Sequence, residues 1–183
     1  MAYIESQEKS NGPKSTKKKR PLELKNNFIN IFFYLVFNMN ERTLIILKPD
    51  TIMRSNIGNV LSRIEAKGLK ISALKMEWIS KEKAGIHYAE HKGKPFYDSL
   101  ISYITSCPVI LGVIEGDEAI TVIRSLCGST DPHKAAPGSI RGDFGYKKGN
   151  DIFNVIHASD SLESAKREIS IFFKDQEVFN YNK

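Results

Sequence analysis

Residues 154–161 read Asn-Val-Ile-His-Ala-Ser-Asp-Ser, which joins the end of an apolar run, one histidine and a cluster of helix-capping residues. The apolar residues before the histidine favour an extended strand. The Ser-Asp-Ser triplet contains residue types whose side chains accept hydrogen bonds from the free N–H groups of a helix start. The stretch therefore predicts a strand that leads into a helix, with His157 at the junction.

Apolar residues after this junction recur every three or four positions, which predicts an amphipathic helix over about residues 161–173. They are Leu162, Ala165, Ile169, Phe172 and Phe173. His157 is then expected just before a helix N-terminus, where N–H groups and the helix dipole favour phosphate. An imidazole there can attack a phosphorus atom and carry the phosphoryl group. A structural or surface histidine is the alternative that position alone leaves open.

Apolar runs and helical periods alternate through the preceding sequence. Strands are predicted at 43–47, 69–79, 108–114 and 152–156, and helices at about 57–67, 80–90, 96–106, from the capping residue Asp117 to 126, and at 161–173. This order of split βαβ units predicts an α+β, ferredoxin-like fold. We expect a four-stranded antiparallel sheet with helices packed on one face.

Three features of this region bear on function. Lys48 follows the first strand, where an ammonium suits phosphate neutralisation, although a solvated cap is the usual role. His87 and His91 have the spacing of a metal pair, but no third ligand is evident, so surface histidines are the preferred interpretation. Residues 129–149 are irregular and rich in Gly, Pro, Ser and Asp, and such long loops tend to be functional or mobile.

Residues 1–38 differ in composition from the rest of the chain. They hold seven Lys and Arg against three Asp and Glu, whereas residues 39–183 hold twenty against eighteen. We predict a disordered basic extension with a short apolar run at 28–37, too short to span a bilayer as a helix. A targeting signal, a nucleic-acid patch at 17–21, or a true start at Met39 are alternatives.

Charge and cysteine content limit the partners and the compartment. The basic charge belongs mostly to the extension, so nucleic acid is an improbable partner of the folded domain. Cys107 and Cys127 lack a CxxC spacing and suit a reducing compartment, as small apolar residues in or near the core. We expect a cytoplasmic protein without a membrane segment, and organellar or nuclear targeting by residues 1–38 is the alternative.

Four segments together resemble the nucleoside diphosphate kinase family, and the resemblance covers residues 41–179. They are LKPD at 47–50, HYAEHKGKPFY at 87–97, GSTDPHKAAPGSIRGDF at 128–144 and NVIHASDSLESAKREI at 154–169. The resemblance implies a ferredoxin-like kinase domain over residues 39–183. It also implies transfer of the γ-phosphoryl group from a nucleoside triphosphate to a nucleoside diphosphate, by ping-pong kinetics through a phosphohistidine.

The resemblance also implies a role for each matched residue. His157 is the expected nucleophile, oriented by Glu168, with Lys48 on the transferred phosphate and Tyr88 near that lysine. The nucleotide contacts are expected from Lys48, Phe96, which stacks on the base, Arg124, Thr130 and Arg141, which hold the phosphates, and Asn154, which binds the sugar. Mg²⁺ is the expected cofactor, held mainly by nucleotide phosphates and water rather than by a protein ligand.

The sequence departs from the family pattern in three places. Residues 145–153 form a longer segment than in common members, which puts the sugar contact of Asn154 in doubt. Ala158 replaces a commoner glycine, and the chain stops at Lys183 without a longer tail. The resemblance implies a homo-oligomer, with a hexamer expected and a tetramer as the alternative. A nucleotide-binding module without turnover is a competing hypothesis, although no matched position is substituted.

Overall fold

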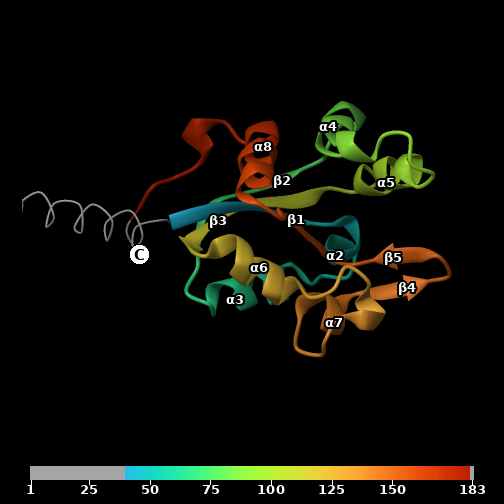
Figure 1. Ribbon diagram of the computed structural model, residues 1–183, viewed down its shortest axis with the longest axis horizontal. Helices are drawn as coiled ribbons and strands as arrows, with labels where there is room; N and C mark the ends of the chain where they lie inside the picture. Colours follow the sequence, from blue (N-terminus) through green and yellow to red (C-terminus); the bar gives the residue numbers. More distant parts are fainter. Residues whose placement is uncertain (1–39, 182–183) are drawn as a thin grey trace, which may run out of the picture. The chain divides into compact units, whose positions relative to one another are not determined.

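The computed structural model describes residues 40–181 (Figure 1). The predicted extension at 1–38, with its basic and apolar runs, lies outside the described residues. The main sheet has the strand order β2-β3-β1-β6, and every neighbouring pair is antiparallel. Its strands are β1 (Asn40–Leu47), β2 (Lys70–Glu77), β3 (Val109–Asp117) and β6 (Ile156–Ala158). This confirms the predicted α+β, ferredoxin-like class with four antiparallel strands.

The remaining elements surround this sheet. The helices are α2 (Pro49–Met53), α3 (Ile57–Glu65), α4 (Lys81–His87), α5 (Tyr97–Ile104), α6 (Ala119–Cys127), α7 (Ile140–Phe144) and α8 (Leu162–Phe172). Short 3₁₀ turns lie at η1 (Ala89–His91), η2 (Pro132–Lys134) and η3 (Asp175–Glu177), and β4 (Tyr146–Lys148) pairs with β5 (Asp151–Phe153) in a separate hairpin. Within residues 40–181, no helix is long and apolar enough to cross a bilayer.

Helices cover both faces of the sheet, which corrects the prediction that they pack on one (Figure 1). Ile45 and Leu47 of β1 pack into a core with α3 and α6. Leu44 and Ile46, which alternate with them, pack into a second core with α4, α5 and α8. Side chains alternate between the two faces of a strand, so a continuous apolar run such as Leu44–Leu47 needs cover on both.

The predicted strand at 152–156 is divided in the structure. The chain forms β5, leaves the extended conformation at Asn154 and Val155, and then forms β6. Val155 has a φ of +67°, and the N–H of Ile156 donates to the carbonyl of Asn154 at 2.6 Å, which makes a three-residue γ-turn. A β-branched residue at positive φ is strained by about 1–3 kcal/mol, so the surrounding contacts must hold it there.

The loop at the start of α2 holds this turn. The carbonyl of Val155 accepts from the N–H of Lys48 at 2.8 Å and from the hydroxyl of Thr51 at 2.6 Å. Its N–H donates to the buried carboxylate of Asp50 at 3.0 Å, and the Tyr103 hydroxyl donates to that carboxylate at 2.5 Å. The LKPD segment thus fixes the backbone that leads into His157.

Of two helix starts predicted from capping residues, one is confirmed and one is wrong. Helix α8 begins as expected, because the Ser161 side chain accepts from the N–H of Ser164. Asp117 does not cap α6, because β3 continues through it and the cap position is Glu118. The carboxylate of Glu41, on β1, accepts from the N–H of Ile120 at 3.2 Å instead. The cap of α6 is therefore a tertiary contact that local spacing cannot predict.

The segment predicted as irregular, 129–149, contains η2, α7 and β4. The longer stretch at 145–153 forms the β4–β5 hairpin, which turns at Gly149 with a φ of +60°. Tyr146 and Phe153 stack across it with ring centroids 4.7 Å apart. The additional residues are thus accommodated before Asn154, which remains buried.

Replacement of Asp50 tests whether this clamp supports the fold. Asp50→Ala removes the acceptor for the Val155 N–H and the Tyr103 hydroxyl, and we expect a loss of about 3 kcal/mol in the free energy of unfolding. Urea unfolding measures this loss. The control is Asp98→Ala, an exposed aspartate on α5, for which we expect a change within about 0.5 kcal/mol. Equal losses in the two variants would contradict the clamp.

Candidate active site

His157 lies in β6 directly opposite Ile46 of β1. Paired residues of antiparallel strands point to the same face, so His157 shares the face of Ile46, which α4 and α8 cover. Its Nε2 lies 2.9 Å from an oxygen of Glu168, whose side chain is buried on α8. The imidazole itself is partly exposed, with 23% of its side chain accessible. The structure therefore brings His157 and Glu168 together, as the sequence predicts.

The protonation state of Glu168 determines which nitrogen of His157 is free. Burial raises the pKa of Glu168, but the hydrogen bonds from His157 and Ser159 outweigh it, and the pKa is lowered overall. The ionised carboxylate can only accept, so Nε2 of a neutral His157 carries the hydrogen. The lone pair is then on Nδ1, which has no hydrogen bond within residues 40–181. This tautomer presents Nδ1 as a nucleophile.

Ser159 ties Glu168 to the sheet. Its hydroxyl donates to the same carboxylate oxygen of Glu168 at 2.7 Å and accepts from the N–H of Leu44 at 3.2 Å. Ser159 is fully buried. The carboxylate is thus held from β6 and, through the hydroxyl, from β1, which fixes the direction of the imidazole that it contacts.

Lys48 and Asn154 lie in contact near this histidine. The Lys48 ammonium donates to the side-chain oxygen of Asn154 at 2.7 Å, and the Asn154 amide donates to the carbonyl of Thr130 at 3.0 Å. Burial, and secondarily the charge of Arg141, lower the pKa of Lys48 to about 8. A cation with a lowered pKa gains most from an anion placed beside it.

Arg141 joins the same group from α7. Its guanidinium donates to the carbonyl of Gly128 at 2.9 Å and to that of Ile156 at 2.8 Å. Its Nε is buried and has no partner within the described residues. Burial and the neighbouring Arg124, which is exposed on α6, both lower the pKa of Arg141. Two guanidinium groups and an ammonium are therefore held near one another without a matching set of carboxylates, which favours a polyanionic ligand.

Aromatic rings connect His157 to the exposed Phe96. His87 lies edge-on to His157 at 4.8 Å between ring centroids, and Tyr88 lies 4.4 Å from His87. His91 lies 6.1 Å from Tyr88, and Phe96 lies 5.6 Å from His91. Phe96 is 50% exposed, and the Lys94 ammonium lies 5.9 Å from the centroid of its ring.

One prediction about this region is corrected. His87 is buried and packs against His157, so it is not the surface histidine that we expected, although His91 is partly exposed. Tyr88 contacts His87 and His91, and its buried hydroxyl has no partner among residues 40–181. His157 precedes α8 in the chain, as expected, and its ring contacts Glu168 in the second half of that helix.

Sequence reasoning missed other residues that build the site. Asp50 and Thr51 hold the turn before His157, and Ser159 holds Glu168. Asp50 belongs to the LKPD segment, so a carboxylate next to a strand-ending proline was an available signal. No pattern indicated that His87 would be buried, because the period of α4 does not identify which helix face meets α8.

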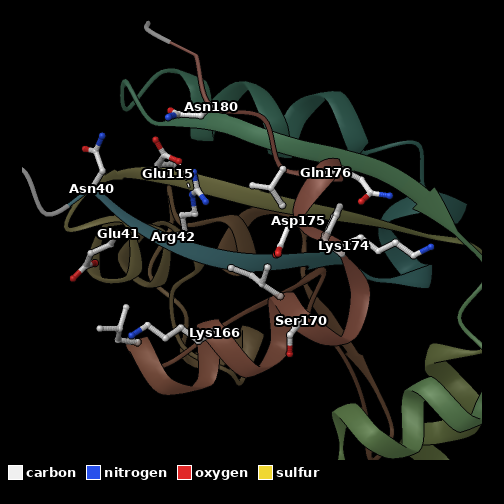
Figure 2. Close-up of a pocket in the computed structure, with 14 residues that line it drawn as sticks. Asn40, Glu41, Arg42, Glu115, Lys166, Ser170, Lys174, Asp175, Gln176 and Asn180 are labelled. Atoms are coloured by element: carbon white, nitrogen blue, oxygen red, sulfur yellow. Dashed lines mark hydrogen bonds and ion pairs between the residues drawn. The ribbon is translucent and has the colours of Figure 1, made fainter.

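A separate hollow of about 1140 Å³ contains none of the predicted site residues. Figure 2 shows its polar lining, which comes from β1, β3, α8 and the C-terminal segment. Within it, Arg42 and Glu115 form an ion pair at 2.6 Å. None of the residues that we expect to bind the nucleotide lines this hollow, so it does not compete with the His157 site as a phosphate site.

The donor set also bears on the expected Mg²⁺. Mg²⁺ prefers oxygen ligands in octahedral geometry and is commonly bound through substrate phosphates and water. The groups around His157 are mainly cations and amides, and no cage of carboxylates faces them within the described residues. The residues therefore fit an ion that arrives with the nucleotide rather than one resident in the protein.

Comparisons with known proteins agree with this chemistry. The family model described as "Nucleoside diphosphate kinase" matches residues 41–178. A nucleoside diphosphate kinase of Pyrococcus furiosus is 57% identical over 146 residues, which are 80% of this chain and 91% of the relative.

Two solved structures are similar in fold and sequence. One is a transition state mimic of the Borrelia burgdorferi nucleoside-diphosphate kinase with bound vanadate and ADP, with a TM-score of 0.75 and 43% identity. The other is the Halobacterium salinarum enzyme in complex with CDP, with a TM-score of 0.75 and 45% identity. Each match covers 79% of this chain and 94% of the other. The chain therefore belongs to the nucleoside diphosphate kinase family and is a phosphotransferase that acts on nucleotides.

Proposed function

We propose that this enzyme moves the γ-phosphoryl group of a nucleoside triphosphate onto a nucleoside diphosphate by a ping-pong mechanism, with a phosphohistidine at His157. The observation that carries the proposal is the contact between Nε2 of His157 and Glu168, which leaves the lone pair on Nδ1. We assign this activity to the predicted domain at residues 39–183.

Each half of the reaction forms one bond to phosphorus and breaks another. Nδ1 of His157 attacks the γ-phosphorus, the bond from phosphorus to the bridging oxygen breaks, and the nucleoside diphosphate leaves with that electron pair. A terminal oxygen of the second nucleoside diphosphate then attacks, and the phosphorus–nitrogen bond breaks. The carboxylate of Glu168 stabilises the positive charge that the imidazole acquires when Nδ1 is phosphorylated.

The cations near His157 supply the charge that phosphoryl transfer requires. We assign Lys48 to the transferred phosphate, and Arg124, Arg141 and Thr130 to the other phosphates. Transfer of this kind depends mostly on positioning and on electrostatic stabilisation. Bound Mg²⁺ would neutralise further phosphate charge. The lowered pKa of Lys48 and the unpaired Nε of Arg141 support these roles. A phosphate would stabilise the charged form of Lys48 and would accept a hydrogen bond from the Arg141 Nε.

The sugar contact is assigned to a buried residue and the base contact to a half-exposed one. We assign Asn154 to the sugar, because its amide lies between Lys48 and the Thr130 carbonyl. We assign Phe96 to the base, and Tyr88 to the packing of the aromatic row beside His157. Stacking does not distinguish the hydrogen-bonding edges of bases, so broad nucleotide tolerance is expected. The ADP and CDP in the names of the two related structures agree with such tolerance.

We further propose that the chain assembles as a homo-oligomer, a hexamer or alternatively a tetramer, through β2. This strand is at one end of the sheet. Leu74 and Met76 on it are 46% and 56% exposed, and Trp78, the residue directly after it, is 65% exposed. Alternate residues of a strand lie on one face, so these side chains form an apolar row. An exposed, apolar edge strand favours association with another chain.

The compartment is proposed from cysteine chemistry. Cys127 is buried, Cys107 is partly exposed, and both are free thiols. Burial raises the pKa of Cys127 to about 11, which suppresses its thiolate. Free thiols suit a reducing compartment, so we place the enzyme in the cytoplasm.

Labelling tests the phosphohistidine. After incubation with γ-labelled ATP and denaturation, we expect acid-labile, base-stable label on the protein, and we expect His157→Ala to lose it with at least about a 10³-fold loss of ATP-to-GDP transfer. The matched control, His133→Ala, changes an exposed histidine and should label normally. Circular dichroism verifies that both variants fold. Transfer that persists in folded His157→Ala would refute the mechanism.

A pH profile tests Lys48. Because its folded-state pKa is about 8, the ammonium loses its proton as pH rises through that value, and kcat/KM for ATP should fall there. Lys48→Arg retains its charge, so its profile should stay level to about pH 10, at lower activity. A decline near pH 8 that is unchanged in Lys48→Arg would assign the titration to another group.

Light scattering coupled to gel filtration tests the assembly surface. We expect the mass of six chains, or of four, for the unmodified protein, and smaller species for Met76→Glu, because a carboxylate buried without a partner costs several kcal/mol. Ile86→Glu is the matched control, since Ile86 is 52% exposed on α4 rather than on β2. A monomeric parent protein, or an unchanged mass in Met76→Glu, would count against this surface.

A further inference from the structure

His87 is buried beside His157 with an unsatisfied imidazole. Only 3% of the residue is exposed, and neither ring nitrogen has a hydrogen-bond partner within residues 40–181. A buried polar group without a partner costs about 1–3 kcal/mol, and such groups often mark an ion or a functional role. The packing of His87 against Tyr88 and Phe172 explains its position but does not use its nitrogens.

His87, His157 and Glu168 together form a set of metal-binding side chains. One ring nitrogen of each histidine and one carboxylate oxygen lie within 4.8 Å of one another. Ligand atoms bound tetrahedrally at about 2.0–2.2 Å from Zn²⁺ are about 3.3 Å apart. The three ligand atoms must therefore move by about 1 Å to bind one ion together. The His157 side chain is partly exposed, which leaves a side of the set open to an incoming ion.

We propose that His87, His157 and Glu168 form an inhibitory site for a borderline-soft divalent ion of the Zn²⁺ class, which competes with phosphorylation of His157. Two imidazoles and one carboxylate match the ligands that Zn²⁺ prefers, with a fourth position left for water. Mg²⁺ prefers oxygen ligands, so it does not suit this set. The site is distinct from the nucleotide phosphates that are expected to carry Mg²⁺.

Electrostatics around His87 suit a neutral ligand. Burial, and then the neighbouring His157, lower the pKa of His87 to about 3, so its imidazole holds no excess proton at neutral pH and needs to release none to bind a metal. Glu168 is ionised and supplies the one negative charge of the set. Arg167, which lies 3.6 Å from the other oxygen of Glu168, opposes the ion and limits its affinity.

Inhibition rests on the proposed function, whereas metal binding does not. An ion on Nδ1 of His157 occupies the proposed nucleophilic lone pair. An ion on Nε2 displaces the hydrogen that Glu168 accepts, and it withdraws electron density from the ring. Phosphorylation of His157 in turn removes a metal ligand or blocks the approach of the ion. The factor by which phosphorylation weakens binding of the ion should therefore equal the factor by which the ion disfavours phosphorylation at equilibrium.

The test uses the full chain, freed of metal, and needs no turnover. Zn²⁺ affinity is measured by competition with a chromophoric chelator, and Co²⁺ serves as the probe of geometry, because tetrahedral Co²⁺ absorbs strongly in the visible range. We expect one ion per chain, a tetrahedral Co²⁺ spectrum, and at least about a tenfold weaker Zn²⁺ affinity in His87→Phe. Phenylalanine keeps the ring packing against Tyr88 and Phe172 but removes the ligand.

Controls separate this site from others on the chain. His133→Phe replaces an exposed histidine outside the set and should bind Zn²⁺ as the parent protein does. His87→Gln, which remains polar, should also lose the site, so the proposal can be tested even if the phenylalanine variant fails to fold. Equal Zn²⁺ affinity in the parent protein and in folded His87→Gln, or no tetrahedral Co²⁺ spectrum with the parent protein, would overturn the site.

The effect of the ion on catalysis is measured in a separate experiment. In excess Mg²⁺, added Zn²⁺ should inhibit ATP-to-GDP transfer by the parent protein, and enzyme phosphorylated beforehand and desalted should bind Zn²⁺ at least about tenfold more weakly. If Zn²⁺ binds at His87 but inhibits neither transfer nor phosphorylation, the inhibitory role is refuted while the metal site stands, and the labelling of His157 shows separately whether its proposed role fails as well. If transfer proceeds through His157 but Zn²⁺ does not bind, the metal site fails alone.

Discussion

The hydrogen bond between His157 and Glu168 is the constraint on which the site depends. A free imidazole interconverts between two tautomers, and only one of them presents the lone pair on Nδ1. Glu168 selects that tautomer because its carboxylate is ionised and can only accept. Burial of a carboxylate is costly, and here the Ser159 hydroxyl and the imidazole offset that cost with two short contacts. The second half of α8 thus contributes to the chemistry through a single oxygen atom.

The backbone around His157 is as constrained as its side chain. Val155 is held at a positive φ by Lys48, Asp50 and Thr51, so the end of β1 and the start of α2 determine where β6 begins. The same short segment also supplies the Lys48 ammonium beside Asn154. One segment therefore sets both the direction of the nucleophile and the position of a cation. This arrangement explains why a strained turn is retained: a relaxed strand through Val155 would not place His157 opposite Ile46 and facing Glu168.

Local sequence patterns predicted the elements whose signals are local, and failed where tertiary contacts decide. The apolar period of residues 161–173 and the cap Ser161 gave α8 within one residue at each end. The resemblance motifs identified Glu168, which contacts His157, and Lys48 and Asn154, which contact each other. They also identified Arg141, which donates to the carbonyl of the residue before His157. The break at Val155 was missed because valine favours strands, and only contacts from α2 force the turn. The burial of His87 was missed because it depends on α4 meeting α8, for which one short helix carries no sequence signal.

A nucleophilic histidine and a metal-binding histidine have the same chemical requirement, which is a neutral imidazole with an available lone pair. The neutral imidazole that makes His157 reactive therefore also makes it a metal ligand. The negative charge of Glu168 stabilises both the phosphorylated imidazole and a bound metal ion. A second imidazole at His87 completes a set that the transfer reaction does not need. The cations nearby oppose metal binding, since Lys48 and Arg141 attract phosphates and repel free metal ions. Selection between an incoming nucleotide and an incoming metal ion is then decided by this positive charge, because the histidines themselves do not distinguish the two.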